Sequence, residues 1–183
     1  MSDELGCYDP VANPYAPGAG TPPPNLVGRD AVLEATSIAL QRLRSGRSGQ
    51  HRMITGLRGV GKTVLLGKLT AVAERNGYRV IRVEAVGGDD TLRSLLRQAR
   101  RIVEELDRSR KVTRALRSIE SVSLTVAGTG VAIDRFDPTP DREALADVVV
   151  DLAAAAHEHE LGVLIAVDEA QLVGRDDLPR LLA

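Results

Sequence analysis

Gly56-Leu57-Arg58-Gly59-Val60-Gly61-Lys62-Thr63 is the stretch that decides the fold. It fits the pattern G-x-x-x-x-G-K-[ST] of a phosphate-binding P-loop. Glycines let the backbone turn its N–H groups inward around an anion, and a helix that starts there points its positive dipole end at the same anion. We expect Lys62 to contact the β- and γ-phosphates of a nucleotide and Thr63 to supply an oxygen to Mg²⁺. The stretch therefore predicts a nucleotide site lined by all eight residues.

The flanking segments supply the setting that such a loop requires. Residues 51–55 read as a short strand entering the loop, and Thr63–Arg75 has apolar residues at helical spacing. Asn76-Gly77 predicts the end of that helix, and Arg79–Val83 predicts the next strand. A glycine-rich turn without a ligand is the alternative, but strand, loop and helix in this order favour the nucleotide site.

A second motif follows later in the chain. Residues 161–169 form an apolar run that ends in Asp168 and Glu169, as is typical of a strand buried on both faces of a parallel sheet. We expect Asp168 to hold Mg²⁺ opposite Thr63 and Glu169 to polarise a water for attack on the γ-phosphate. The alternative is a buried strand ending in a solvated acidic turn. Because the adjacent Glu argues against small-molecule kinases and GTPases, we expect ATP hydrolysis, with Glu169 and Lys62 as catalytic residues.

The composition restricts the remaining possibilities. The 183 residues include 24 basic and 25 acidic side chains, and the near-neutral charge predicts no strong nucleic-acid or membrane partner. Cys7 is the only cysteine, which excludes an intramolecular disulfide. We find neither an apolar run long enough to span a membrane nor the pattern of a signal peptide. We therefore expect a cytoplasmic protein.

The rest of the chain reads as a leader and one domain. Residues 1–24, rich in proline and glycine, predict an extended leader, and residues 25–183 predict the ATP-binding domain. We expect further helices over residues 30–44, 90–106 and 141–160.

Two segments before the last of these helices have more than one interpretation. Basic residues outnumber acidic ones between Arg93 and Arg117, which indicates a nucleic-acid-facing patch or, as we favour, a solvated helix face. Ser121–Ile133 alternates apolar residues and turns through Gly128-Thr129-Gly130, which predicts an inserted β-hairpin.

With Gly28-Arg29, the loop and Val167-Asp168-Glu169-Ala170-Gln171 in this order, residues 12–183 resemble the AAA+/STAND branch of P-loop ATPases. The chain is most similar to origin-recognition-complex-like and archaeal-type ATPases, including a group of actinobacterial ATP-binding proteins. The resemblance implies ATP and Mg²⁺ as ligands and an α/β fold, a three-layer α/β/α P-loop NTPase with a parallel sheet in the order 5-1-4-3-2. It also implies that Val27, Gly28 and Arg29 lie near the adenine. Tyr15, from the leader, is our hypothesis for a residue that covers the ring.

The resemblance implies further parts beyond residue 183: strands 4 and 5, a sensor, an arginine finger, a lid and any winged-helix domain. We therefore expect the N-terminal portion of a longer protein, incomplete at its C-terminus, with a DNA or protein partner and an ATP-dependent oligomer depending on the missing parts. Two functions stay open. One is an ATP-binding module that hydrolyses ATP in its complete form; the other is a nucleotide-gated assembly module with little or no hydrolysis. A replication initiator or DNA-loading factor is a third interpretation, which rests on the resemblance.

Overall fold

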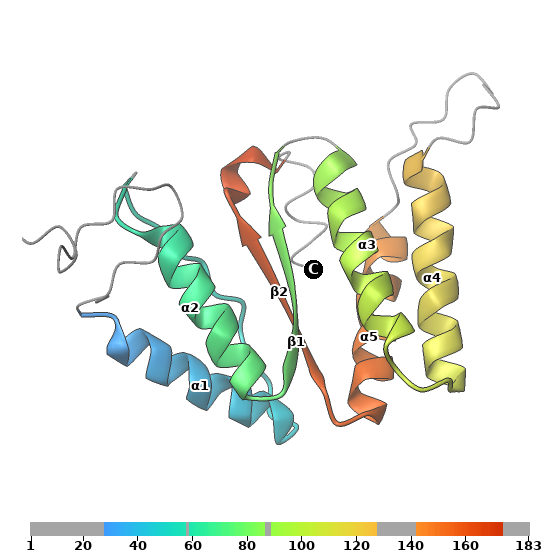
Figure 1. Ribbon diagram of the computed structural model, residues 1–183, viewed down its shortest axis with the longest axis horizontal. Coiled ribbons are helices and arrows are strands. Elements are labelled where there is room, and N and C mark those ends of the chain that lie inside the picture. The colour runs from blue at the N-terminus through green and yellow to red at the C-terminus, as the bar shows by residue number, and fades with distance from the viewer. Residues whose placement is uncertain (1–27, 58, 87–88, 128–141, 174–183) are drawn as a thin grey trace, which may run out of the picture.

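The computed structural model describes residues 28–57, 59–86, 89–127 and 142–173, which contain five α-helices and two β-strands (Figure 1). Their order along the chain is α1 (Asp30–Arg44), α2 (Lys62–Arg75), β1 (Tyr78–Glu84), α3 (Asp89–Glu104), α4 (Arg110–Ala127), α5 (Arg142–Glu158) and β2 (Gly162–Asp168). A 3₁₀ turn, Ala170–Leu172, follows β2. No helix in these ranges is long and apolar enough to cross a membrane.

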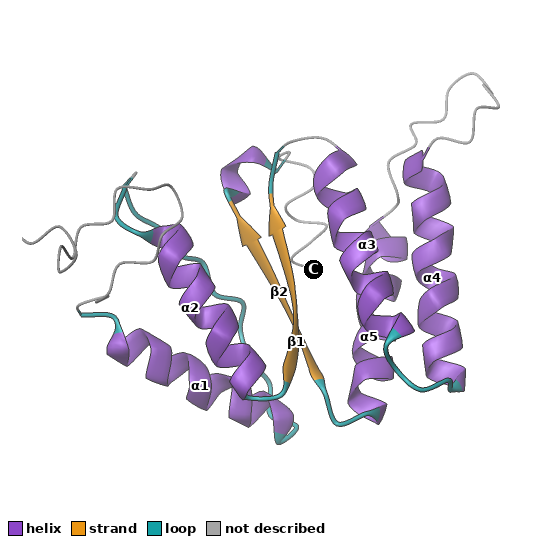
Figure 2. Cartoon of the chain, viewed as in Figure 1, coloured by secondary structure: helices purple, strands orange, loops and turns teal. Residues whose placement is uncertain are grey.

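The two strands form a parallel pair between two layers of helices (Figure 2). The pairing runs from Tyr78 opposite Gly162 to Glu84 opposite Asp168. On one face, α1 and α2 enclose a small core that includes Leu40 and Tyr78. On the other face, α3 and α5 pack on the sheet and α4 packs on both helices, around a larger core. The described residues thus have the predicted three-layer α/β/α arrangement, with two strands in the sheet.

The strand sequences explain why polar groups gather at one end of the sheet. Successive side chains of a strand point to opposite faces, so alternate residues face α2. On that face, β1 begins with Tyr78 and Val80, which pack in the small core, and ends with Arg82 and Glu84. The β2 strand changes in the same way, from an apolar start to Asp168 at its carboxyl end. The charged ends of both strands therefore lie together, next to the start of α2.

The predicted β-hairpin is wrong over the described residues, because Ser121–Ala127 is the last part of α4. The apolar residues of this segment continue a helical face that begins at the start of α4, and its buried members are Val112, Ala115, Ile119 and Val122. Leu124, which the alternating pattern treated as equivalent to Val122, is 61% exposed. A period of 3.6 that is sustained from Val112 to Val122 outweighs a period of 2 over a few residues. Residues 128–133 of the predicted hairpin lie outside the described residues.

A buried carboxylate joins α4 to α5. Asp151 of α5 is 5% exposed and accepts a hydrogen bond from Ser118 Oγ at 2.6 Å. Arg114 Nε lies 2.9 Å from the other carboxylate oxygen of Asp151. Both partners come from α4, so this cluster fixes how the outer helix packs on α5.

The strand predicted over residues 51–55 is not formed, and residues 51–57 run as irregular chain. A strand needs a neighbour for its backbone groups. In the implied order one further strand separates this segment from β2, and the described ranges hold none at that position. Arg52 instead ties the segment to α1, where its guanidinium donates to Thr36 Oγ1 at 2.9 Å and to the Ala35 carbonyl oxygen at 3.1 Å.

The β2 strand was expected to be buried on both faces. Among the described residues its outer edge has no neighbouring strand. Ala166 is buried, and the other residues of the strand are partly exposed. The expectation of a fully buried strand is therefore wrong for the described part of the chain.

Candidate nucleotide site

The glycine-rich loop leads directly into α2. Gly59 and Gly61 have φ angles of 83° and 80°, in the left-handed region that favours glycine. Gly61 is the N-cap of α2 and has no side chain to cap the helix, so the first amide N–H groups remain available to an anion. Arg58 lies outside the described residues, and Leu57 and Val60 are exposed on the loop. The backbone of the loop is therefore suited to phosphate binding.

Lys62, the first residue of α2, folds back over the loop. Its ammonium group donates to the carbonyl oxygens of Gly56 at 3.0 Å and Leu57 at 2.9 Å. These bonds hold the positive charge against the start of the loop, which a phosphate on the loop would also approach. A phosphate bound there would meet the loop amides and the lysine together.

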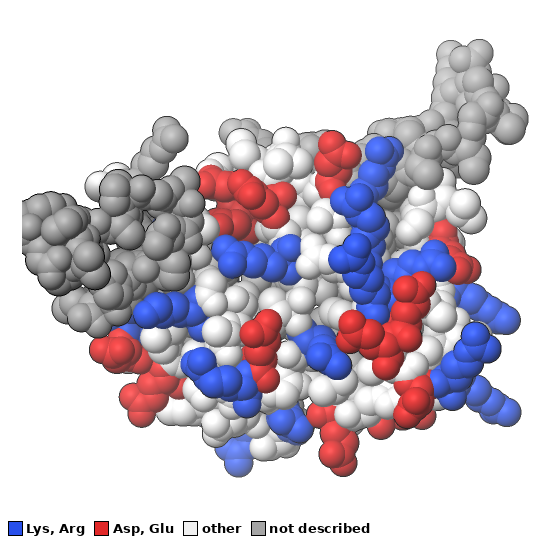
Figure 3. Space-filling model, in the orientation of Figure 1, with Lys and Arg blue, Asp and Glu red and all other residues white. Residues whose placement is uncertain are grey.

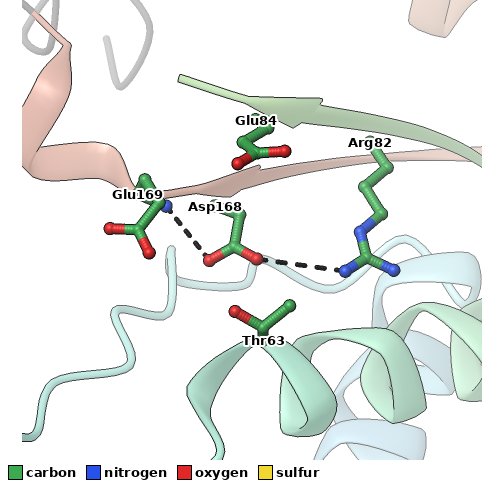
Figure 4. A pocket seen from close by; sticks show the side chains of 5 residues that line it. All are labelled: Thr63, Arg82, Glu84, Asp168 and Glu169. Carbon is green, nitrogen blue, oxygen red and sulfur yellow. Dashed lines mark hydrogen bonds and ion pairs between the residues drawn. The ribbon is translucent and has the colours of Figure 1, made fainter. Parts of the chain in front are cut away.

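A pocket of about 350 Å³ adjoins the start of α2. Thr63 lines it from α2, Arg82 and Glu84 from β1, and Asp168 and Glu169 from the end of β2 (Figure 4). Segments distant in sequence therefore supply its hydroxyl, its three carboxylates and its guanidinium. The structure brings together Thr63, Asp168 and Glu169, as the sequence motifs predict.

Asp168 is the central acid of the pocket. Its side chain is 16% exposed, and its Oδ2 lies 3.9 Å from Arg82 Nη2. Its Oδ1 accepts a hydrogen bond of 3.0 Å from the Glu169 backbone N–H. One carboxylate oxygen thus faces a backbone donor and the other faces a cation (Figure 4).

Glu169 turns the chain out of the sheet. Its φ angle is 52°, an unusual conformation for a residue with a side chain, and it precedes the 3₁₀ turn. Its carboxylate is exposed and accepts a hydrogen bond from the Gln171 side-chain amide. Gln171 therefore orients the acid that the sequence predicts to act on water.

The residues around the pocket fit a magnesium ion that is shared with a phosphate group. Their donors are hydroxyl and carboxylate oxygens, which Mg²⁺ prefers. Within the described ranges, no cluster of three or more His, Cys, Asp or Glu side chains could hold a metal alone. Mg²⁺ commonly binds through one or two carboxylates plus substrate phosphates. Thr63 and Asp168 are placed to supply the protein's share.

Arg82 and Glu84 are pocket residues that the sequence analysis missed. The predicted strand, Arg79–Val83, includes Arg82 and ends one residue before Glu84, and neither residue was assigned a role. The signal was available, because carboxyl ends of neighbouring parallel strands meet at the same edge of a sheet, and Glu84 pairs in register with Asp168. Finding them required knowing that β1 and β2 are neighbours.

The predicted adenine side is described only in part. Gly28, with a φ angle of 78°, and Arg29 form the turn that begins α1. Val27, the leader and Tyr15 lie outside the described residues.

The basic residues of α3 and α4 lie among acidic side chains (Figure 3). Arg100 pairs with Glu104 at 2.7 Å and lies 3.8 Å from Glu120. On α4, Arg114 pairs with buried Asp151. These ion pairs offset part of the basic charge, as expected for a solvated helix face.

A family model described as an AAA ATPase domain matches residues 25–183. No curated protein and no solved structure gives a match. The matched range includes the loop, both strands and every residue that lines the pocket.

Proposed function

Because the chain belongs to the AAA ATPase domain family, we propose that it is an ATP-binding module of the AAA+/STAND type, which hydrolyses ATP to ADP and phosphate in its complete form. The observation that carries this proposal is the meeting of Thr63 with Asp168 and Glu169 at one pocket. Thr63 lies in the first turn of the helix that follows the glycine-rich loop, Asp168 is the last residue of β2, and Glu169 follows it. This pairing of a phosphate loop with acids is what phosphoryl chemistry requires.

In this proposal each residue has one task. The loop amides and Lys62 bind the phosphates, and Thr63 and Asp168 hold Mg²⁺, which would neutralise charge on the phosphate oxygens. Glu169 orients the attacking water and accepts its proton. The hydrogen bond from Gln171 supports the position of the Glu169 carboxylate.

Nucleotide binding is tested by calorimetric titration of the wild type and two lysine variants with Mg-ATP. Lys62→Ala should abolish binding, because the side chain supplies the loop's positive charge. Lys68→Ala is the matched control, since Lys68 lies on the same helix and lines no part of the pocket. Equal affinity in wild type and Lys62→Ala would contradict the proposal.

Hydrolysis is tested separately with Glu169→Gln. This variant should bind Mg-ATP as the wild type does and release no phosphate, because the amide cannot accept a proton. Phosphate release at the same rate in both proteins would exclude Glu169 as the catalytic base.

A nucleotide-gated assembly module with little or no hydrolysis is the second candidate. The Gln171 hydrogen bond favours it, because the amide occupies one of the two Glu169 carboxylate oxygens that a water would otherwise contact. Stoichiometric ATP binding without turnover would support this function. Turnover that rises in Gln171→Ala would show that the bond restrains an active catalytic site.

We also propose a finer placement within the family, near the origin-recognition-complex-like and archaeal-type ATPases, in a cytoplasmic protein. The order of Gly28-Arg29, the loop and the Asp168-Glu169 pair supports it. Val27, Gly28 and Arg29 would lie beside the adenine. We propose a DNA or protein partner and an ATP-dependent oligomer. Sedimentation with and without Mg-ATP tests the oligomer.

A further inference from the structure

Arg82 occupies a prepared position in the pocket. Its side chain lies on the face of β1 that is covered by α2, at the level of Gly67. A Cβ atom at position 67 would lie 3.4 Å from Arg82 Nη1. Glycine is unfavourable inside a helix, so its presence in the middle of α2 calls for a packing reason. A Cβ alone would meet the guanidinium at about contact distance, so it is a longer side chain at position 67 that would displace Arg82.

The backbone of Arg82 is held as well. Gln98 of α3 accepts a hydrogen bond from the Arg82 N–H at 3.1 Å and donates one to the Arg82 carbonyl oxygen at 2.7 Å. This pair of hydrogen bonds fixes the backbone of β1 at Arg82. Arg82 is therefore positioned from both sides of β1, by α3 through its backbone and by α2 through its side chain.

The charges around Arg82 explain what it does there. Glu84 and Asp168 are paired in register, and Glu169 follows, so three carboxylates line one pocket. Three negative charges that line one pocket repel one another. Lys62 is engaged with loop carbonyl oxygens, and Arg82 is the cation that the described residues place against Asp168, at 3.9 Å. Its charge offsets the repulsion while the pocket holds no metal.

Resting on the proposed function, we propose that Arg82 is a positioning residue that serves as the internal counter-ion of Asp168 and competes with Mg²⁺ for it. The guanidinium faces Oδ2, one of the two oxygens through which Asp168 could bind Mg²⁺, and its charge repels a second cation that approaches the same carboxylate. Binding of Mg²⁺ with ATP is therefore weakened for as long as the guanidinium stays beside Asp168. Arg82 is about half exposed, so it can swing into solvent or toward a phosphate.

The test compares the Mg²⁺ dependence of ATP binding in three proteins: wild type, Arg82→Gln and Arg79→Gln. Arg79→Gln is the matched control, because it removes the same charge from the same strand, where Arg79 pairs with Glu105 at 3.4 Å. Calorimetric ATP titrations at a series of Mg²⁺ concentrations give the half-saturating Mg²⁺ concentration. We expect it to fall about fivefold in Arg82→Gln, the range of a half-exposed ion pair, and to stay at the wild-type value in Arg79→Gln.

The same titrations and one further variant separate the possible failures. If the wild type binds no ATP at any Mg²⁺ concentration, both the proposed function and this inference are wrong. If it binds ATP and the Arg82→Gln midpoint equals that of Arg79→Gln or rises, the inference alone is wrong. Gly67→Leu, which fills the space of the guanidinium without removing its charge, should lower the midpoint in the same direction. An unchanged midpoint in a folded Gly67→Leu protein would also overturn the inference.

Discussion

The cluster around Asp151 makes a quantitative test of how α4 is held on α5. In Arg114→Met the buried carboxylate loses its cation but keeps the 2.6 Å hydrogen bond from Ser118. Breaking a fully buried ion pair destabilises a protein by about 3–5 kcal/mol. Arg114 is 73% exposed, however, so water can approach the carboxylate from that side. We therefore expect a loss of about 1–2 kcal/mol in the free energy of unfolding for the single variant.

Removal of both donors should cost more than the two single changes together. In Arg114→Met/Ser118→Ala the carboxylate has neither partner, and we expect a loss of about 3–5 kcal/mol. Urea unfolding followed by circular dichroism measures each value. Arg117→Met, on the same helix, is the control, since the described ranges show no ion pair for this exposed arginine. The reasoning is refuted if Arg114→Met equals the control, or if it costs as much in an Asp151→Leu background.

Three further predictions follow from individual contacts. Tyr78→Phe removes the 2.8 Å hydrogen bond to the Leu40 carbonyl oxygen and should cost about 1 kcal/mol. Burial raises the pKa of Tyr78 above 10.0, although the charge of Arg44 acts in the opposite direction. The contribution of Tyr78 to stability is therefore complete below pH 10 and is lost as the pH rises further. Urea titrations at alkaline pH should show a steeper loss of stability in wild type than in Tyr78→Phe. Gly61 and Gly46 have φ angles of 80° and 74°, so Gly61→Ala and Gly46→Ala should each lower the free energy of unfolding by about 1–2 kcal/mol. Calorimetry should find ATP binding weakened about tenfold in Gly61→Ala and unchanged in Gly46→Ala. Gly162→Ala would drive a Cβ into the buried Tyr78 ring and should cost about 1–3 kcal/mol in thermal unfolding, whereas an unchanged melting temperature would show that the ring can move.

Local patterns in the sequence were sufficient for much of the fold. The ends of α1 and α2, the positions of β1 and β2 and the helix before β2 follow from periodicity and from turn residues such as Asn76-Gly77. The loop and the pair Asp168-Glu169 could be assigned because each motif combines residue types that phosphate and metal binding require. These features depend on neighbours in the chain.

Features that depend on distant partners could not be predicted in the same way. The strand expected over residues 51–55 needs a neighbouring strand, and no local pattern states whether that neighbour is present. The hairpin was wrong because Val122 fits an alternating pattern locally and a helical one from Val112 onward. Arg82 and Glu84 escaped notice because neither belongs to a motif. The implied strand order makes their strand a neighbour of the strand that ends in Asp168, but the register that pairs Glu84 with Asp168 is given only by the structure.

The side chain of Gln98 has a consequence for how this sheet can grow. An outer strand normally exposes backbone donors and acceptors that a foreign strand can adopt, which invites aggregation. At the middle of β1 both groups of Arg82 are already taken by an amide that imitates a neighbouring backbone. A foreign strand that pairs with this edge of β1 would have to displace Gln98 first. Among the described residues, addition of a strand is therefore hindered at this point of β1, and the sheet is left to extend along the outer edge of β2.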